Sequence, residues 1–289
     1  MNTKVPATLN MIGCGKAGRI LGHLWHRAGV FNIGGVLTRS IESATAAVEQ
    51  MGAGTPLRLL SELESAELTL IATPDREIKG IATSLASGAV LDRDSIVFHL
   101  SGALDSSLFR QAGLEQVNVA SVHPLRSFAD PNLSAAEFVG TWCGFEGESE
   151  TEHSLYSAFE KIGARMFRIE PDRKLIYHAA SVMVSNYINA LIESGINTFQ
   201  LAGIDRQTVS AMIAPIVRNT CDNIIKSDPG SALTGPIMRG DWQIVERELE
   251  NLRELDPNLG DVYRVLGKAT LSLAESNSLL TAEQISKLG

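Results

Sequence analysis

Residues 8–18 read Thr-Leu-Asn-Met-Ile-Gly-Cys-Gly-Lys-Ala-Gly, and this stretch decides the fold. An apolar run ends at Gly13, and Gly13, Gly15 and Gly18 have the spacing G-x-G-x-x-G. The next segment places four apolar residues on one face of a helix: Ile20, Leu21, Leu24 and Trp25. A strand, a glycine-rich turn and a helix in this order form a unit that binds the pyrophosphate of a dinucleotide. The alternative is an ordinary glycine-rich turn.

Each glycine has a separate role in such a unit. Gly13 permits the tight turn, Gly15 lets a pyrophosphate approach the backbone, and Gly18 lets the helix pack closely on the strand. The helix N-terminus adds free N–H groups and a partial positive charge. The predicted cofactor-binding loop comprises Gly13, Cys14, Gly15, Lys16, Ala17 and Gly18.

The composition is that of a water-soluble chain. Its 289 residues favour two domains, and 25 Lys and Arg against 33 Asp and Glu give a net charge of −8. This charge argues against nucleic acid or an anionic membrane as the main partner. Three widely spaced cysteines fit neither a disulfide framework nor a zinc site, and no metal-ligand spacing is present. We see no signal peptide, and the apolar stretches fall short of a membrane span, so we expect a cytoplasmic protein.

The first part of the chain alternates strands with helices. Strands are expected at residues 33–37, 67–75, 95–102, 117–122, 138–145 and 166–169. Strands that alternate with helices and short loops predict an α/β fold with a parallel, doubly wound sheet.

The pattern changes near residue 170, because no alternation of period two follows. Helices are expected at residues 174–201, 206–226, 241–253 and 257–277, with apolar residues of the first available for burial. Asp205 and Asp241 are predicted N-caps. We therefore predict a dinucleotide-binding domain at 1–170 and an all-helical substrate and dimerisation domain at 171–289.

Thr38-Arg39-Ser40 follows the second strand, where NAD-binding units usually have an acid for the ribose hydroxyl. Arg39 would instead pair with a 2′-phosphate, and Thr38 and Ser40 would add hydroxyl groups. This loop favours NADP over NAD. The alternative is a solvated turn with a surface arginine.

Further polar loops follow later strands, where the carboxyl ends of parallel strands line a ligand crevice. Ala72, Thr73 and Pro74 end one strand, and Ser101 and Gly102 end the next. We expect these five residues to contact the cofactor.

Two histidines lie near the same edge. His123 precedes a proline and could serve as a general acid, or simply bond to a backbone carbonyl. His99 lies within an apolar strand, which favours a structural role.

Polar residues also begin the first long helix. Lys174 stands at its start, and His178, Ser181 and Ser185 share one face, with Asn186 close to it. These residues indicate a lined pocket or a solvated stripe.

One loop of the helical domain has a similar character. Thr234 and Arg239 lie in a loop interrupted by glycine and proline. Arg239 could bind a substrate carboxylate or brace Asp241.

Together these residues resemble the 6-phosphogluconate-dehydrogenase-like superfamily. More closely, the chain is similar to Rossmann-like NADP-binding oxidoreductases with a C-terminal helical domain of unknown function. The motifs that carry the resemblance are Gly13 to Gly18, Ala72 to Asp75, Ser101-Gly102, His123-Pro124-Leu125 with Ser127-Phe128, Tyr177-His178-Ala179-Ala180, Ser185-Asn186, Thr234-Gly235-Pro236 and Arg239-Gly240-Asp241. The resemblance implies a Rossmann domain, an all-helical second domain and a homodimer. Relatives include pyrroline-5-carboxylate reductase and ketopantoate reductase.

One position departs from these relatives. The β-hydroxyacid and ketopantoate enzymes have a lysine four residues before an asparagine on the first long helix, and Val182 stands there in this chain. Their catalytic lysine therefore has no counterpart. His178 and His123 become the first candidates for the proton donor, and Lys174 the next.

The leading hypothesis is an NADP-dependent oxidoreductase. It would act on a small carbonyl, imine or hydroxy compound in the cleft between the domains, with the nicotinamide near Thr73, Pro74 and Ser101. Asn186 would orient the substrate, and Ser185, Thr234 and Arg239 would help to bind it. One alternative is a non-catalytic NADP(H)-binding regulatory or scaffold protein, and another is ketopantoate reductase.

Overall fold

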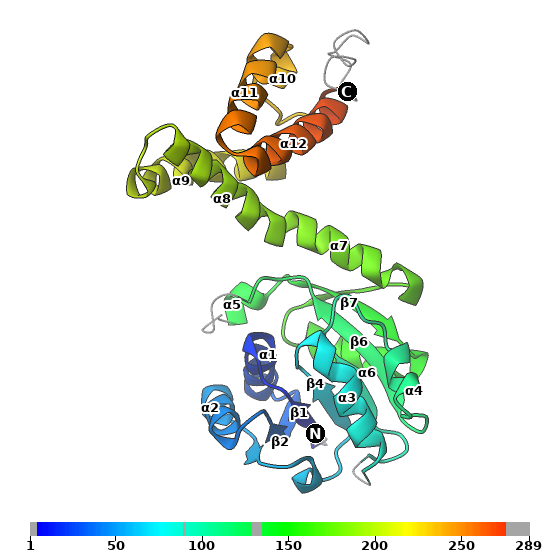
Figure 1. Cartoon of the computed structure of the whole chain (residues 1–289). Helices are drawn as coiled ribbons and strands as arrows, with labels where there is room; N and C mark the ends of the chain where they lie inside the picture. The colour runs from blue at the N-terminus through cyan, green and yellow to red at the C-terminus, as the bar shows by residue number, and fades with distance from the viewer. Residues whose placement is uncertain (1–4, 89–90, 129–134, 276–289) are drawn as a thin grey trace. The chain divides into compact units, whose positions relative to one another are not determined.

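The computed structural model describes residues 5–88, 91–128 and 135–275 (Figure 1). By its internal contacts the chain divides into two compact units, Met1–Ser185 and Asn186–Gly289. The sequence-based boundary near residue 170 lies one helix earlier. Each unit is described by itself below.

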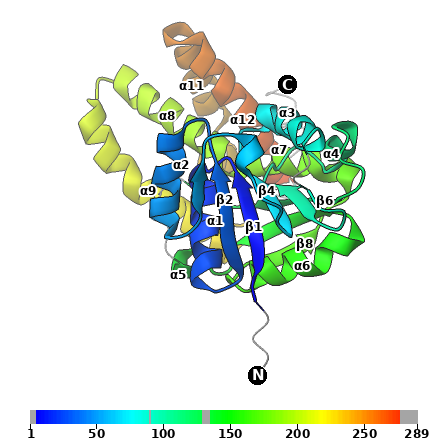
Figure 2. The same ribbon diagram turned by 90° about the horizontal axis from the view of Figure 1, so that it is seen from below.

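The first unit contains an eight-stranded sheet with the order β3-β2-β1-β4-β5-β6-β7-β8 (Figure 2). The strands are β1 Ala7–Ile12, β2 Phe31–Leu37, β3 Thr55–Leu57, β4 Leu68–Ile71, β5 Ile96–His99, β6 Asn118–Pro124, β7 Trp142–Gly147 and β8 Arg165–Arg168. The chain runs outward from β1 to β3, then returns beside β1 with β4 and runs outward on the other side. The strand order therefore reverses between β1 and β4, where ligands bind in sheets of this kind.

Helices cover both faces of this sheet (Figures 1 and 2). They are α1 Lys16–Arg27, α2 Ile41–Met51, α3 Asp75–Ala86, α4 Ser107–Gln111, α5 Ala135–Phe138 and α6 Ser149–Glu160, with short 3₁₀ turns at Leu60–Glu62 and Pro171–Arg173. Successive strand residues point to opposite faces, so two apolar cores form. One core packs α1, α2 and α6 on the sheet around Trp25, and the other packs α3 and α4 around Phe109.

The predicted α/β fold is confirmed, with two differences in the sheet. β7 pairs antiparallel with β6, whereas every other neighbouring pair is parallel. A parallel pairing needs a crossover, usually a helix, and the described part of the β6–β7 connection holds only the four-residue α5. The short edge strand β3 was not predicted, because three residues with a central Pro56 carry no periodic signal.

Helix α7, Lys174–Val184, ends the first unit, and its burial is the reverse of what we expected. Lys174 is fully buried and His178 partly buried, whereas apolar side chains such as Ile176 and Met183 are exposed. The helix therefore turns polar residues toward its own sheet. The predicted burial of its apolar residues was wrong within the single chain.

The segment Pro171–Leu201 is long and apolar enough to cross a membrane by length and composition. The sequence-based expectation concerned uninterrupted apolar runs, whereas this segment reaches its mean hydropathy with polar side chains scattered among the apolar ones. The segment is not one continuous helix. Ser185 has non-helical backbone angles and separates α7 from the next helix.

The second unit is helical throughout its described part, as predicted. Its helices are α8 Asn186–Leu201, α9 Arg206–Lys226, α10 Pro236–Arg239, α11 Trp242–Leu255 and α12 Pro257–Glu275. Asp205 caps α9 by accepting hydrogen bonds from the Gln207 and Thr208 backbones, as predicted. Asp241 does not cap α11 through its side chain, because its carboxylate binds Arg239 instead. The last two residues of the predicted helix 257–277 lie outside the described chain.

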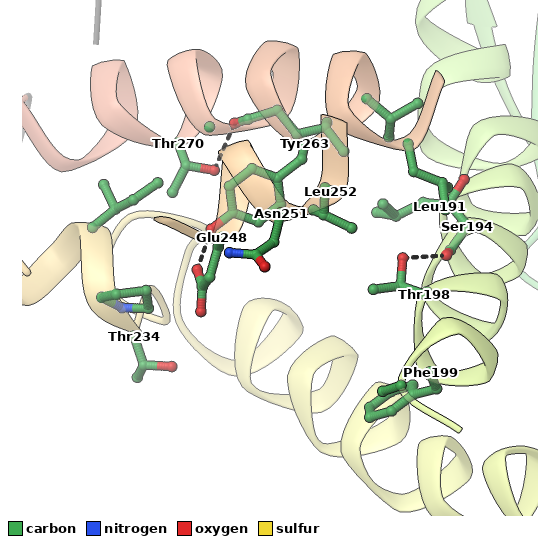
Figure 3. Close-up of a pocket in the computed structure, with 18 of the residues that line it drawn as sticks. Leu191, Ser194, Thr198, Phe199, Thr234, Glu248, Asn251, Leu252, Tyr263 and Thr270 are labelled. Carbon is green, nitrogen blue, oxygen red and sulfur yellow. Dashed lines mark hydrogen bonds between the residues drawn. The ribbon is translucent and has the colours of Figure 1, made fainter. Parts of the chain in front are cut away.

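A cavity of about 800 Å³ lies within this second unit (Figure 3). Its lining is mainly apolar, with residues from α8, α11 and α12 such as Leu191, Phe199, Leu252 and Leu266. Tyr263 donates a hydrogen bond to Glu248 within it, at 2.5 Å. This cavity was not predicted, because its lining residues come from helices distant in the chain.

Candidate functional site

The glycine loop lies where the strand order reverses. The Gly13 backbone N–H donates to the Leu37 carbonyl oxygen at 2.7 Å, which ties the loop to the end of β2. Gly13 has φ +79°, and a Cβ there would lie 2.3 Å from Thr73 Cγ2 and 2.8 Å from the Ala72 carbonyl carbon. Only glycine fits, because both the backbone angle and the neighbouring strand exclude a side chain.

The next two glycines also match their expected roles. A Cβ on Gly15 would meet nothing within 4 Å, so this side of the loop is open, whereas a Cβ on Gly18 would lie 3.0 Å from Ala72 Cβ. Gly15 is the N-cap of α1 and offers no side chain to its N–H groups. An open backbone before a helix N-terminus fits a dinucleotide pyrophosphate.

Cys14 belongs to this loop as a small buried residue. Burial raises the pKa of its thiol to about 12, so the sulfur stays protonated at neutral pH. Its carbonyl oxygen accepts a hydrogen bond from Arg19 Nε at 2.8 Å. Cys14 therefore shapes the loop and offers no thiolate.

The predicted 2′-phosphate loop lies between β2 and α2. Thr38 Oγ1 donates to the Ser40 carbonyl at 2.8 Å, and Ser40 Oγ accepts from Ser43 N at 3.3 Å as the N-cap of α2. Both hydroxyl groups thus also stabilise the turn and the helix cap. Arg39 is exposed, and none of the ion pairs of the described chain includes it.

A chain of contacts links the glycine loop to the loops after β4 and β5. Thr73 touches the Gly13 turn, and its Oγ1 is buried without a hydrogen-bond partner among the described residues. Two residues later, Asp75 Oδ2 accepts from Ser101 Oγ at 2.7 Å. Ser101 Oγ in turn accepts from the Ala103 and Leu104 backbones. The three loops therefore form one continuous edge.

Two histidines meet over Gly102 at this edge. A Cβ on Gly102 would lie 2.5 Å from His178 Nδ1 and 2.9 Å from His123 Nε2, so glycine is required for both rings to approach. The ring centroids of His123 and His178 are 5.8 Å apart. Tyr177 Oη lies 2.9 Å from His123 Nδ1, within hydrogen-bond distance. His178 Nδ1 is buried and has no partner in the described part of the chain.

The surroundings of His123 favour its neutral form. Burial, and to a smaller extent the positive charge of Lys174 and the neighbouring His178 ring, together lower the pKa of His123 to about 4. The pKa of Tyr177 is raised to about 12, mainly by burial. At pH 7 this pair therefore offers hydrogen bonds without a net charge.

His99 has the structural role that we favoured for it. It is fully buried in β5, and its Nδ1 accepts from the Ser101 backbone N–H at 3.1 Å. Burial lowers the pKa of His99 to about 3.

Lys174, the next candidate proton donor after the two histidines, is enclosed within the single chain. Its side chain is 0% exposed, and Nζ donates to Ser121 Oγ in the middle of β6.

The remaining predicted residues belong to other parts of the chain. Ser185 lies at the break after α7, Asn186 begins α8, and Thr234 lines the cavity of the second unit. Arg239 Nε donates to Asp241 Oδ2 at 2.8 Å, the brace that was the alternative to substrate binding.

Two residues of the site were not predicted. Tyr177 precedes His178 on α7, and Glu146 is a buried acid on β7 whose carboxylate accepts two hydrogen bonds from Ser106. An acid within the otherwise apolar strand Trp142–Gly147 is a signal that could have drawn attention to Glu146.

Comparisons with known proteins agree with this architecture. The model of a Rossmann-like domain matches residues 4–123, and the model of a domain of unknown function (DUF2520) matches residues 141–270. No curated protein matches the sequence.

Several solved structures are similar over nearly the whole chain. Protein TM1727 from Thermotoga maritima is 30% identical, with a TM-score of 0.73, covering 93% of this chain and 99% of that one. A candidate NADP oxidoreductase, BF3122 from Bacteroides fragilis, is 18% identical with a TM-score of 0.76, covering 92% and 98%. Pyrroline carboxylate reductase from Plasmodium falciparum, solved with NADP bound, is 15% identical with a TM-score of 0.54, covering 93% and 99%. The last two share the fold.

The identity to TM1727 extends over both units and over almost all of that protein. The chain therefore belongs to the TM1727 family, in which a Rossmann-like domain is followed by the domain of unknown function DUF2520.

Proposed function

We propose that this protein is an NADP-dependent oxidoreductase that acts on a small carbonyl, imine or hydroxy compound. The observation that carries the proposal is the continuous edge from the open glycine loop to the two histidines. Gly13 touches Thr73, Asp75 bonds to Ser101, and both histidines lie against Gly102. A dinucleotide cradle and a pair of proton-handling groups thus share one edge of one sheet.

The residues of this edge fit the cofactor. Gly15 leaves the loop open, the N-terminus of α1 lacks a side-chain cap, and Thr73 Oγ1 has no partner among the described residues. Arg39 would bind the 2′-phosphate that distinguishes NADP from NAD. NADP, when bound, supplies or accepts a hydride. NADP-bound pyrroline carboxylate reductase, which shares the fold, supports this choice.

The histidines would handle the proton of the reaction. His123 is uncharged at pH 7, so its ring can hydrogen-bond to a substrate oxygen or nitrogen and, as a general base, accept the proton that a hydroxy substrate releases; the imidazolium so formed returns that proton in the reverse direction. His178 presents a buried Nδ1 without a partner in the described chain, ready to bind the same group. Tyr177, bonded to His123 Nδ1, orients the ring. We retain as proposed substrate-binding residues Ser185, Asn186, Thr234 and Arg239.

Turnover of NADPH tests the proposal. We expect absorbance loss at the NADPH band with at least one member of a panel of small 2-oxo acids, cyclic imines and ketopantoate. His123→Gln and His178→Gln should slow turnover at least about tenfold and leave NADPH affinity unchanged, because neither ring belongs to the glycine loop. The matched control is His153→Gln, because His153 is an exposed histidine on α6.

A non-catalytic NADP(H)-binding protein is the second candidate, favoured by Val182 in place of the superfamily lysine. It predicts tight NADPH binding with no oxidation across the whole panel. That result would refute the oxidoreductase. Failure of NADPH to bind at all would refute both candidates.

We also propose a cytoplasmic homodimer, with α7 and α8 at its interface. Apolar side chains of these helices are exposed, among them Ile176, Met183 and Tyr187. So many exposed apolar side chains on each of the two helices are unusual on a monomer surface. Light scattering should give twice the chain mass for the wild type, and Tyr187→Glu should shift it toward the monomer. A monomeric wild type at micromolar concentration would contradict this part of the proposal.

A further inference from the structure

The cavity of the second unit has the form of a site for a small organic molecule. Its volume is about 800 Å³, and every residue that lines it belongs to this unit. Figure 3 shows the apolar side chains of Leu191 and Phe199 on one side of this space, with Glu248 and Tyr263 on the other. A mainly apolar pocket of this size with a few polar groups is typical of a ligand site.

Glu248 on α11 gives the cavity its charge. It is the one residue with a charged side chain among the described residues that line the cavity. No ion pair within residues 5–88, 91–128 and 135–275 includes it. Its side chain is exposed, so a ligand that enters the cavity can reach the carboxylate. The rings of Phe199 and Tyr263 also line the cavity, and aromatic ring faces attract cations. The lining therefore favours a cation over an anion.

The hydrogen bonds of the lining favour a ligand that donates. Three lining hydroxyl groups use their hydrogen within their own helix: Ser194 donates to the Ala190 carbonyl at 2.9 Å, Thr198 to the Ser194 carbonyl at 2.9 Å, and Thr270 to the Leu266 carbonyl at 2.8 Å. Tyr263 donates its hydroxyl hydrogen to Glu248, and Asn251 Nδ2 donates to the Arg247 carbonyl at 2.7 Å. The oxygen atoms of these side chains can still accept, so the polar part of the lining offers mainly acceptors.

We propose that this cavity binds an organic amine in its protonated form, with the ammonium group at Glu248 and the apolar body between α8, α11 and α12. An ammonium group carries a positive charge and only donors, so it matches both the carboxylate and the acceptors of the lining. An organic acid would meet Glu248 as a like charge, and an alcohol would gain no charge interaction. The proposal does not rest on the proposed function, because no lining residue belongs to the glycine loop or to the histidine cluster.

The test compares three probes with a similar apolar body, namely hexylamine, hexanol and hexanoate. An NMR titration of the full chain at pH 7 follows the assigned methyl signals of Leu252 and Leu266, which line the cavity. We expect all these signals to shift with hexylamine. The amine should bind at least about tenfold more tightly than hexanoate, with hexanol between them.

Two substitutions link the binding to this cavity. Glu248→Gln removes the charge and keeps an oxygen that can accept from Tyr263, so it should weaken hexylamine binding at least about tenfold and leave hexanol binding unchanged. The matched control is Glu250→Gln, because Glu250 is an exposed acid on α11 that does not line the cavity. Gly195→Leu fills the cavity from α8, where a Cβ would meet nothing within 4 Å, and should abolish binding of all three probes. Leucine is also a better helix former than glycine, so this variant should fold.

Equal affinities for hexylamine and hexanoate would overturn the proposal, as would unchanged hexylamine binding in Glu248→Gln or in Gly195→Leu. Absence of binding by all three probes would overturn it as well. Light scattering at the same concentration would then show whether a second copy of the chain accompanies the closed cavity. No step of the test uses NADPH, so its result is independent of the search for turnover.

Discussion

The two substitutions Gly15→Ala and Gly13→Ala separate cofactor binding from folding within one loop. Gly15 has φ −67° and ψ −173°, an extended conformation that alanine adopts without strain. A methyl group there would meet nothing within 4 Å. We therefore expect Gly15→Ala to change the free energy of unfolding by no more than about 1 kcal/mol, the loss of a glycine N-cap included.

Gly13→Ala should behave in the opposite way. A left-handed φ of +79° disfavours alanine by about 1–2 kcal/mol. The methyl group would also lie 2.8 Å from both the carbonyl carbon and the oxygen of Ala72, which are backbone atoms. Overpacking of this kind adds about 1–3 kcal/mol. The sum, about 2–5 kcal/mol, should appear as a clear loss of stability in urea unfolding.

Gly15→Ala should weaken cofactor binding, although it hardly changes the stability of the protein. Its methyl group occupies the open side of the loop where the pyrophosphate would approach the backbone. We expect NADPH affinity to fall at least about tenfold, which corresponds to about 1.4 kcal/mol, while the unfolding midpoint stays near that of the wild type. Calorimetric titration and urea unfolding measure the two quantities. If Gly15→Ala binds NADPH as tightly as the wild type, the glycine loop is not the pyrophosphate site. If Gly13→Ala is as stable as the wild type, the packing argument for Gly13 is wrong.

Three further outcomes are expected. Arg39→Ala should weaken NADP binding about tenfold and leave NAD binding unchanged, whereas the control Arg27→Ala, at another exposed arginine, should change neither. If the ratio of the NADP and NAD affinities is unaltered in Arg39→Ala, Arg39 does not belong to the cofactor site. Because the pKa of His123 is lowered from 6.5 to about 4, the unfolded chain binds a proton between these values that the folded chain does not. The free energy of unfolding should therefore fall as the pH drops from 6.5 to 4. In urea unfolding, His123→Gln should reduce this loss by about 1–3 kcal/mol. An identical pH dependence of the wild type and His123→Gln would contradict the buried neutral ring. In the native protein a thiol reagent at pH 8 should modify exposed Cys221 and spare the two buried cysteines, and three equivalents of rapid labelling would contradict their burial.

Local patterns predicted most of the helices and strands of both units. The glycine spacing, the apolar strands and the helix at 206–226 were all visible because each is encoded by neighbouring residues. Two features of the sheet were not predicted. Strand β3 is too short to show an alternating pattern of apolar residues, and the antiparallel direction of β7 depends on the connection from β6 and not on the residues of β7 itself.

The site was harder to predict because it depends on where α7 packs. His123 and Ser101 could be proposed from their places after buried strands. The enclosure of Lys174 and the bond from His123 to Tyr177 join residues more than fifty positions apart, which no local pattern encodes. The same long-range packing explains the error about burial, since apolar spacing shows which residues share a face and not which face meets the sheet.

The orientation of α7 also leaves buried polar groups without partners at its edge of the sheet, as the proposed ligand site requires. A polar helix face turned onto a sheet is stable only where its groups find partners, as Lys174 does with Ser121 and Tyr177 with His123. His178 Nδ1 and, at the same edge, Thr73 Oγ1 find none within the described chain, and each unpaired buried group costs about 1–3 kcal/mol. A ligand that bonds to both would recover this energy only in the folded state, so binding and folding are coupled. At a ligand concentration of 100 times Kd the stabilisation is about 2.7 kcal/mol, and removal of either group should reduce it by lowering the affinity.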